Sequence, residues 1–318
     1  MLTYILLILG FIFLVKGAAL LIDGSTSLAK RFGISDLAIG LTIVAFGTSA
    51  PELVINLFSN FRNLSDLALG NIIGANIANI LLIGGLAALI APIQIRGRAV
   101  WKEILLGLLA LVALLLFAND FFLNNSLATY ISRWDGLFLI ILFLVFLYYT
   151  FGLSKADVKD MPEYSAQKLD VSWAYVILGI GALVVGGKWI IDGAREISLI
   201  LGFSQSLIGL TILAVGTTLP ELATSLVAAF KKNGDLAIGN IVGSNIFNIF
   251  FIIGFSSLIK PLAFNNILNT DIIIGLVATV LLFWFVLTGK RERNIERWEG
   301  LALFCLYLVY LSFLIYRG

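Results

Sequence analysis

The sequence holds ten separate apolar stretches, each close to the ~20 residues that a helix needs to cross the hydrocarbon core of a bilayer. Charged or turn-rich segments separate nearly every neighbouring pair. Because 60% of the 318 residues are hydrophobic and only 13% are charged, these stretches cannot form the core of a soluble globule. The prediction is an all-α membrane protein with ten transmembrane helices, near residues 3–24, 36–59, 67–92, 99–118, 135–153, 172–193, 205–230, 236–259, 270–289 and 299–316.

Lysine and arginine residues indicate which side of the membrane each connection faces. They gather in alternate connections, such as those that hold Lys30 and Arg31 or Arg96 and Arg98, and are scarcer in the others. Short basic loops of membrane proteins face the cytoplasm. Since an even number of spans returns the chain to its starting side, we expect a multi-pass protein of the cell membrane with both termini outside.

Composition also limits the chemistry that the chain can perform. The sequence has no histidine, and its single cysteine, Cys305, lies in an apolar stretch. Zinc-hydrolase motifs, histidine-dependent triads and an intramolecular disulfide are therefore excluded. The net charge of +2 gives no reason to expect nucleic acid as a partner. We expect no enzyme activity and no resident cofactor; the predicted partners are the lipid bilayer and transported cations, and the oligomeric state stays open.

The two halves of the chain are copies of one another. Glu52 and Pro92 recur 169 positions later as Glu221 and Pro261, in one register without a gap. Each half holds five spans, and an odd number forces the second copy to enter the membrane upside down relative to the first. A duplication that only enlarges the bundle is the alternative, but it does not explain why the similarity gathers on polar residues. We predict a first five-helix repeat at residues 1–153 and a second, inverted one at residues 171–318. A cytoplasmic linker at residues 154–170 joins them.

The best-matched segment of each half combines hydroxyls, a proline and a carboxylate. The first copy reads Gly-Thr-Ser-Ala-Pro-Glu and ends at Glu52, and the second reads Gly-Thr-Thr-Leu-Pro-Glu and ends at Glu221. Proline removes one helical hydrogen bond and frees the carbonyl four residues earlier, so each span is expected to break locally. Thr48 and Thr217 each precede their glutamate by four residues, so each hydroxyl can share a face with its own carboxylate.

Glu52 and Glu221 are the only acidic residues deep inside predicted spans, and the predicted symmetry brings them together near the midplane. Two carboxylates repel one another there. A Ca²⁺ ion would neutralise both, and it prefers the hard oxygen ligands that this segment offers. Na⁺ can use the same oxygens, but each Na⁺ brings half the charge, so more than one must replace a Ca²⁺. Competition for one cavity predicts cation exchange; two protonated glutamates that hydrogen-bond for structure remain the alternative.

The span after each motif carries asparagines among glycines. It reads Gly-Asn-Ile-Ile-Gly-Ala-Asn-Ile-Ala-Asn over residues 70–79 and Gly-Asn-Ile-Val-Gly-Ser-Asn-Ile-Phe-Asn over residues 239–248. Glycine allows close helix approach, and amides can either bridge helices or offer neutral oxygen ligands. Both interpretations stay open for Asn71, Asn76, Asn240 and Asn245.

These paired motifs resemble the alpha repeats of the sodium/calcium exchanger family, within the cation/Ca²⁺ antiporter superfamily, and the chain looks most like its short prokaryotic members. The resemblance covers essentially the whole chain. It implies a secondary active antiporter that exchanges Na⁺ for Ca²⁺ by alternating access, electrogenically, with residues 3–24 and 172–193 sliding across the rest. The implied ligands are Thr48, Glu52, Thr217 and Glu221 for Ca²⁺ and Na⁺, and Ala45, Ser49, Asn79, Ala214, Thr218, Ser244 and Asn248 for Na⁺.

Three positions depart from the family pattern. Ala75 stands where a serine is common, so one Na⁺ position loses an oxygen, and Thr218 replaces a common serine conservatively. Asn248 occupies a position where potassium-dependent relatives carry Asp, which argues against potassium co-transport. Two other functions remain to be separated from Na⁺/Ca²⁺ exchange: H⁺/Ca²⁺ (or other cation/Ca²⁺) exchange on the same scaffold, and a passive cation channel.

Overall fold

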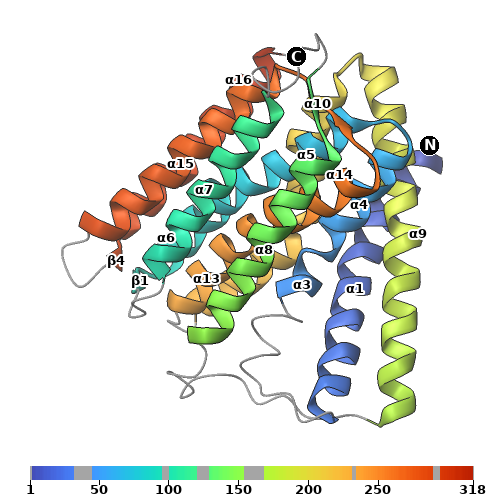
Figure 1. The fold of residues 1–318 in the computed structure, drawn as a ribbon, viewed down its shortest axis with the longest axis horizontal. Helices are drawn as coiled ribbons and strands as arrows, with labels where there is room; N and C mark the ends of the chain where they lie inside the picture. The colour runs from blue at the N-terminus through green and yellow to red at the C-terminus, as the bar shows by residue number, and fades with distance from the viewer. Residues whose placement is uncertain are drawn as a thin grey trace.

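The computed structural model describes residues 2–31, 45–94, 100–119, 129–153, 168–230, 234–288 and 294–317, which form a bundle of helices (Figure 1). The described elements of the first half are α1 (Leu2–Arg31), α3 (Ala45–Thr48), α4 (Ala50–Phe61), α5 (Ser65–Ala78), the π-helix η2 (Asn79–Gly84), α6 (Gly85–Ile90), β1 (Ile93–Gln94), α7 (Val100–Ala118), β2 (Tyr130–Ile131) and α8 (Arg133–Leu153).

The described elements of the second half follow nearly the same order. They are α9 (Leu169–Leu201), α10 (Gln205–Ile208), η3 (Gly209–Leu213), α11 (Ala214–Thr217), α12 (Leu219–Phe230), α13 (Gly234–Ile246), η4 (Phe247–Ile253), α14 (Gly254–Ile259), β3 (Leu262–Ala263), α15 (Leu268–Thr288), β4 (Asn294–Ile295) and α16 (Arg297–Arg317).

Seven helices of the described chain are long and apolar enough to cross a membrane. An eighth candidate is broken: Gln205–Thr217 and Leu219–Phe230 together pass the same test but are bent by 48°. The chain is therefore a multi-pass helical membrane protein. The count of ten spans stays a prediction, because the predicted span at residues 36–59 begins outside the described residues.

The first and sixth predicted spans are longer than the sequence suggested. Residues 3–24 and 172–193 were expected, whereas α1 has 30 residues and α9 has 33. At 1.5 Å per residue these helices measure about 45 and 50 Å, more than the ~30 Å hydrocarbon core. Hydropathy marks where lipid contact stops, but a helix continues as long as its backbone hydrogen bonds do. Accordingly, α9 begins at Leu169, inside the predicted linker, while residues 154–167 lie outside the described chain.

Helices α1 and α9 are equivalent helices of the two halves and run in opposite directions. The two helices lie side by side (Figure 1) and run antiparallel, since Gly10 of α1 lies opposite Gly186 of α9 and Gly17 opposite Gly179. A Cβ on Gly17 would lie 2.9 Å from the Gly179 carbonyl oxygen, so only glycine permits this approach. Gly10 and Gly17 recur 169 positions later as Gly179 and Gly186, so equivalent residues form one seam.

Short contacts between the halves hold the helix ends together. Strand β1 pairs with β4, and β2 pairs with β3, each pair antiparallel and each joining one half to the other. The Asn60 amide donates to the carbonyls of Ser256 and Lys260 at the end of α14. In return, the Lys260 ammonium donates to the Asn60 carbonyl at the end of α4. The all-α prediction missed these strands, which are two residues each and lack a long alternating pattern.

The centre of the bundle is formed by two continuous paths, α5–η2–α6 and α13–η4–α14. The candidate spans on these paths, Ser65–Ile90 and Ala237–Ile259, are 83% and 78% buried, against 28% for the span in α1 and 33% for that in α9. Side chains from α5, α13 and η4, including Ile72, Ile77, Ile241 and Phe250, belong to one apolar core. The equivalent central helices of the two halves therefore pack in the middle of the protein.

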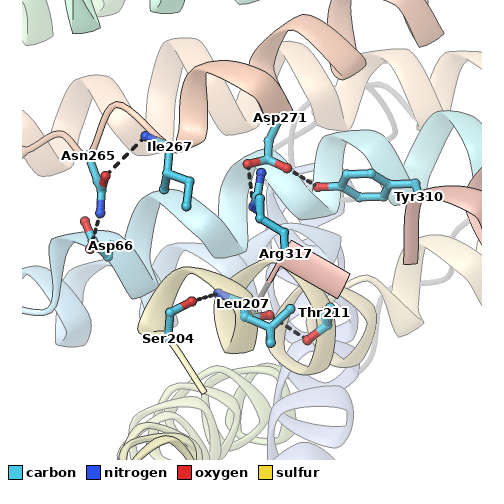
Figure 2. Close-up of polar contacts among 9 residues, drawn as sticks. All are labelled: Asp66, Ser204, Leu207, Thr211, Asn265, Ile267, Asp271, Tyr310 and Arg317. Carbon is cyan, nitrogen blue, oxygen red and sulfur yellow. Dashed lines mark hydrogen bonds and ion pairs between the residues drawn. The ribbon is translucent and has the colours of Figure 1, made fainter. Parts of the chain in front are cut away.

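A buried carboxylate near the start of α15 was missed by sequence reasoning. Asp271 is 0% exposed; its Oδ2 lies 3.0 Å from Arg317 of α16, and its Oδ1 accepts a hydrogen bond from the Tyr310 hydroxyl at 2.9 Å (Figure 2). The sequence places Asp271 near a span end, where a charge is ordinarily solvated. Here α16 covers Asp271 and excludes solvent, so the Arg317 guanidinium balances the carboxylate charge in place of water.

We predict that Arg317→Gln destabilises the protein by about 3 kcal/mol, because loss of one partner leaves the other charge buried and uncompensated. The measurement is thermal unfolding in detergent. The matched control is Arg133→Gln, which alters an exposed arginine whose guanidinium donates to the Ile259 carbonyl. Adding Asp271→Asn to Arg317→Gln should restore most of the loss. A double variant as unstable as the single one would contradict the ion-pair explanation.

Candidate cation site between two broken helices

Both proline motifs break their helices, as the sequence predicted. In the first half α3 ends at Thr48 and α4 begins at Ala50, with Ser49 between them at φ −86° and ψ 6°. In the second half Thr218 separates α11 from α12 at φ −80° and ψ 6°. The prolines follow within the first turn of the new helix, where a missing N–H is tolerated. The two breaks thus have the same geometry in both copies.

The two glutamates are removed from solvent. Glu52 is 0% exposed and Glu221 is 1% exposed, and Glu221 lies within electrostatic reach of Glu52. Neither carboxylate oxygen of Glu52 accepts a hydrogen bond within the described residues. Buried polar groups without partners are rare and costly in folded proteins. The pair therefore buries two carboxyl groups with three of their four oxygens unpartnered in the described chain, and these oxygens are available to a cation.

Further unpartnered atoms in the predicted site can also ligate a cation. Glu221 Oε2, Asn79 Oδ1, Asn248 Oδ1 and Ser244 Oγ are all buried without a hydrogen-bond partner in the described chain. Within that part of the chain no three Asp, Glu, His or Cys residues gather as a possible metal site. A cation held here would bind two carboxylates and several neutral oxygens, a ligand set that suits hard ions such as Ca²⁺.

The contacts of the hydroxyl groups cross from one half to the other. The Ser49 hydroxyl donates to Glu221 Oε1 at 3.2 Å. Thr48 also lies close to Glu221, while Thr217 lies close to Glu52. The sequence spacing suggested that each threonine can share a face with its own glutamate, which stays a prediction. The pseudo-symmetric packing thus adds contacts between each motif and the glutamate of the other half.

The carbonyl of Ala214 is already occupied in this structure. It accepts hydrogen bonds from the Thr218 amide at 3.2 Å and the Thr218 hydroxyl at 2.9 Å, and a longer one from the Thr217 hydroxyl at 3.4 Å. Ala214 is the first residue of α11, as Ala45 is the first residue of α3. An ion that uses the Ala214 carbonyl and the Thr218 hydroxyl must therefore compete with the bond between them.

The asparagines left open by the sequence bridge elements in the structure. Asn76 and Asn245 each donate to the other's backbone carbonyl, at 3.3 and 3.0 Å. Asn240 donates to the Glu221 carbonyl at 3.2 Å, and Asn71 accepts a hydrogen bond from Thr217 at 3.2 Å. These residues thus support the site by holding its helices together.

Sequence reasoning missed three π-helices in the described chain that lie at or beside predicted site residues. One of them, η3, ends at Leu213, directly before Ala214. Helix α5 passes into η2 at Asn79, and α13 passes into η4 at Phe247, one residue before Asn248. A π-helix rotates the residues beyond it relative to a regular helix and is often found at functional sites. The apolar residues that follow carry no pattern from which this change could be predicted.

The structure buries nearly all of the predicted site residues inside the bundle, and contacts between the halves join Ser49 with Glu221 and Asn79 with Asn245. Ala75, where the expected serine is absent, is buried there as well and presents only a methyl group. The side chain of Ala45 lies outside what the structure describes, although its backbone belongs to α3. The remaining predicted residues with buried side chains are Thr48, Ser49, Glu52, Asn79, Ala214, Thr217, Thr218, Glu221, Ser244 and Asn248.

Comparison with known proteins places this architecture among ion exchangers. The family model for sodium/calcium exchanger protein matches residues 2–152 and 171–316. The putative antiporter CaxA of Alkalimonas amylolytica is 36% identical over 96% of each chain. The sodium/calcium exchanger MaX1 of Methanosarcina acetivorans is 31% identical over 99% of each chain. A solved structure of the sodium-calcium exchanger NCX_Mj matches with a TM-score of 0.67 and 31% identity, covering 98% of both chains.

We predict that millimolar Ca²⁺ raises the unfolding temperature of the purified protein, and that Glu52→Gln removes most of this shift. A ligand at 100 times its dissociation constant stabilises the folded state by about 2.7 kcal/mol. The measurement is thermal unfolding in sodium-free buffer with and without Ca²⁺. Glu196→Gln, on α9 and outside the site, is the control and should keep the full shift. An undiminished shift in Glu52→Gln would show that Ca²⁺ stabilises the protein from another place.

Proposed function

Because the chain belongs to the sodium/calcium exchanger family and has the plan of its short prokaryotic members, we propose that it is a secondary active antiporter that exchanges Na⁺ for Ca²⁺ across the cell membrane. The observation that carries the proposal is the pair of buried glutamates, Glu52 and Glu221, which leave three of their four carboxylate oxygens without a hydrogen-bond partner in the described chain. When both carboxylates are ionised, such a buried pair is stable only with cations beside it.

The charge of the cavity explains how two different ions can compete for it. One Ca²⁺ balances two carboxylates, and at least two Na⁺ are needed for the same effect. Neutral oxygens add further positions without adding charge, so the cavity can hold more Na⁺ than neutrality requires. We propose that exchange is electrogenic for this reason, with more than two Na⁺ for each Ca²⁺.

The proposed ligands follow from this difference between charged and neutral oxygens. Oxygens of the two glutamates and two threonines serve both ions, and the surrounding neutral oxygens serve Na⁺. The Ala75 methyl group replaces one possible hydroxyl, so the Na⁺ position beside it would take water or bind weakly. The shared ligands are Thr48, Glu52, Thr217 and Glu221, and the Na⁺ ligands are Ala45, Ser49, Asn79, Ala214, Thr218, Ser244 and Asn248.

Alternating access would move α1 and α9 together across the other helices. Their close glycine seam supports movement of the two helices as one body, and the large exposed share of both helices leaves one side free of protein contacts. The exposed ion pair between Arg62, which directly follows α4, and Asp192 of α9 links this body to the remainder at one end. Surface ion pairs are weak, so it would not prevent the motion. In the proposed orientation both termini face outward.

We predict that vesicles loaded with Na⁺ take up labelled Ca²⁺ only while the Na⁺ gradient exists, and that Glu52→Gln abolishes this uptake. The reason is that a single remaining carboxylate cannot balance a Ca²⁺. The measurement is uptake into proteoliposomes, with Glu196→Gln as the control. Uptake driven equally well by a pH gradient in sodium-free buffer would instead identify an H⁺/Ca²⁺ exchanger, and absence of saturable counterflow would identify a channel.

We predict that an interior-positive membrane potential accelerates Ca²⁺ uptake into Na⁺-loaded vesicles. If more than two Na⁺ leave for each Ca²⁺ that enters, net positive charge moves outward, and an interior-positive potential drives it in that direction. The potential can be set with an ionophore and a gradient of an otherwise inert ion. A rate that is independent of potential would mean that two Na⁺ exchange for one Ca²⁺.

A further inference from the structure

We propose that Asn76 and Asn245 are positioning residues, which fix the amides of Asn248 and Asn79 with their oxygens, and not their nitrogens, free to bind cations. The proposal rests on the proposed function, because it concerns two ligands of the site proposed there. It assigns to the first asparagine of each Asn-x-x-Asn segment a task that is separate from ligation.

An asparagine ligand poses a problem that a carboxylate or hydroxyl ligand does not. Its side chain ends in a carbonyl oxygen, which attracts a cation, and an NH₂ group, which repels one, and the two ends have nearly the same shape. Packing alone cannot distinguish them. A hydrogen bond to one end is therefore required if the oxygen is to face the ions consistently.

The hydrogen bonds around Asn245 determine the direction of the whole network. The Asn245 Nδ2 donates to the backbone carbonyl of Asn76 at 3.0 Å, and a backbone carbonyl can only accept. The Asn245 Oδ1 must then face the other way, where it accepts from Asn79 Nδ2 at 2.9 Å. As a result the Asn79 Oδ1 points away from this bond and remains buried without a partner in the described chain.

The same arrangement recurs on the other side of the pseudo-two-fold axis. The Asn76 Nδ2 donates to the Asn245 backbone carbonyl at 3.3 Å, and its Oδ1 accepts from Asn248 Nδ2 at 2.9 Å. The Asn248 Oδ1 is likewise buried and unpartnered. Each half thus orients the ligand amide of the other half, and both free ends are oxygens.

The orienting task can be separated from simple helix bridging by changing the ligand. Aspartate at position 248 has two carboxylate oxygens and no NH₂ end that could face the ions. Its orientation therefore does not depend on Asn76. A purely structural asparagine would be equally important whichever residue occupied position 248.

The test measures the Na⁺ concentration that gives half of the thermal stabilisation of the purified protein in choline buffer. Asn76→Leu should raise this concentration about 10-fold to 100-fold, as is usual when the partner that orients a metal ligand is lost. In an Asn248→Asp background, Asn76→Leu should change the half-saturating Na⁺ concentration by less than about threefold. A change of that size is what two substitutions show when they do not act on one another.

The matched control is Asn119→Leu. Asn119 and Asn269 form another reciprocal amide pair, between the end of α7 and α15, with both bonds at 2.7 Å. Loss of this pair should lower the unfolding temperature without changing the half-saturating Na⁺ concentration. If Asn76→Leu does not give a monodisperse protein, Asn76→Ser removes the same acceptor with a smaller side chain and should give the same increase.

An unchanged Na⁺ concentration in folded Asn76→Leu or Asn76→Ser would overturn the proposal, and so would an equal increase in the Asn248→Asp background. Failure of the proposed function gives a different result. In that case the unaltered protein still binds Na⁺ in the thermal measurement, but vesicles show no Ca²⁺ uptake that depends on the Na⁺ gradient.

Discussion

The burial of two carboxyl groups close to one another is the constraint on which the rest of the structure depends. Glu52 and Glu221 lie within the protein at a depth where an unpaired charge costs several kcal/mol or more. The ion pairs Arg62–Asp192 and Arg317–Asp271 involve other carboxylates. The charge of the glutamate pair can be balanced by ions that enter from water, and such balancing is reversible. A permanent internal counterion would remove the reason for ions to bind and exchange.

The duplicated architecture brings the two carboxyl groups together, because each half contributes one glutamate and neither half forms the site by itself. Ser49 donates to Glu221 of the other half, and each first asparagine orients an amide across the same boundary. The antiparallel seam of α1 and α9 follows the same repeat, and the short strands join the halves at their ends. A change in how the halves pack would therefore alter the surroundings of the two glutamates directly.

Much of the site could be predicted from local sequence. The helix breaks at Ser49 and Thr218 follow from proline, whose effect reaches only a few residues. The family resemblance read from the two motifs is confirmed by the match over residues 2–152 and 171–316. What local sequence did not predict are the π-helices, the added length of α1 and α9 and the burial of Asp271. Each of these depends on the neighbours that cover a segment.

The sequence by itself determined that the chain enters a membrane, that it is built twice and that two carboxylates lie beside helix breaks. These properties follow from hydropathy, a fixed 169-residue register and the chemistry of proline, all of which act along the chain. The tertiary structure alone decided which donor groups of one half meet which oxygens of the other. The crossed contacts join residues 166 to 172 positions apart, such as Asn79 with Asn245 and Asn76 with Asn248. No local pattern encodes such pairs, because they form only when two inverted halves pack together.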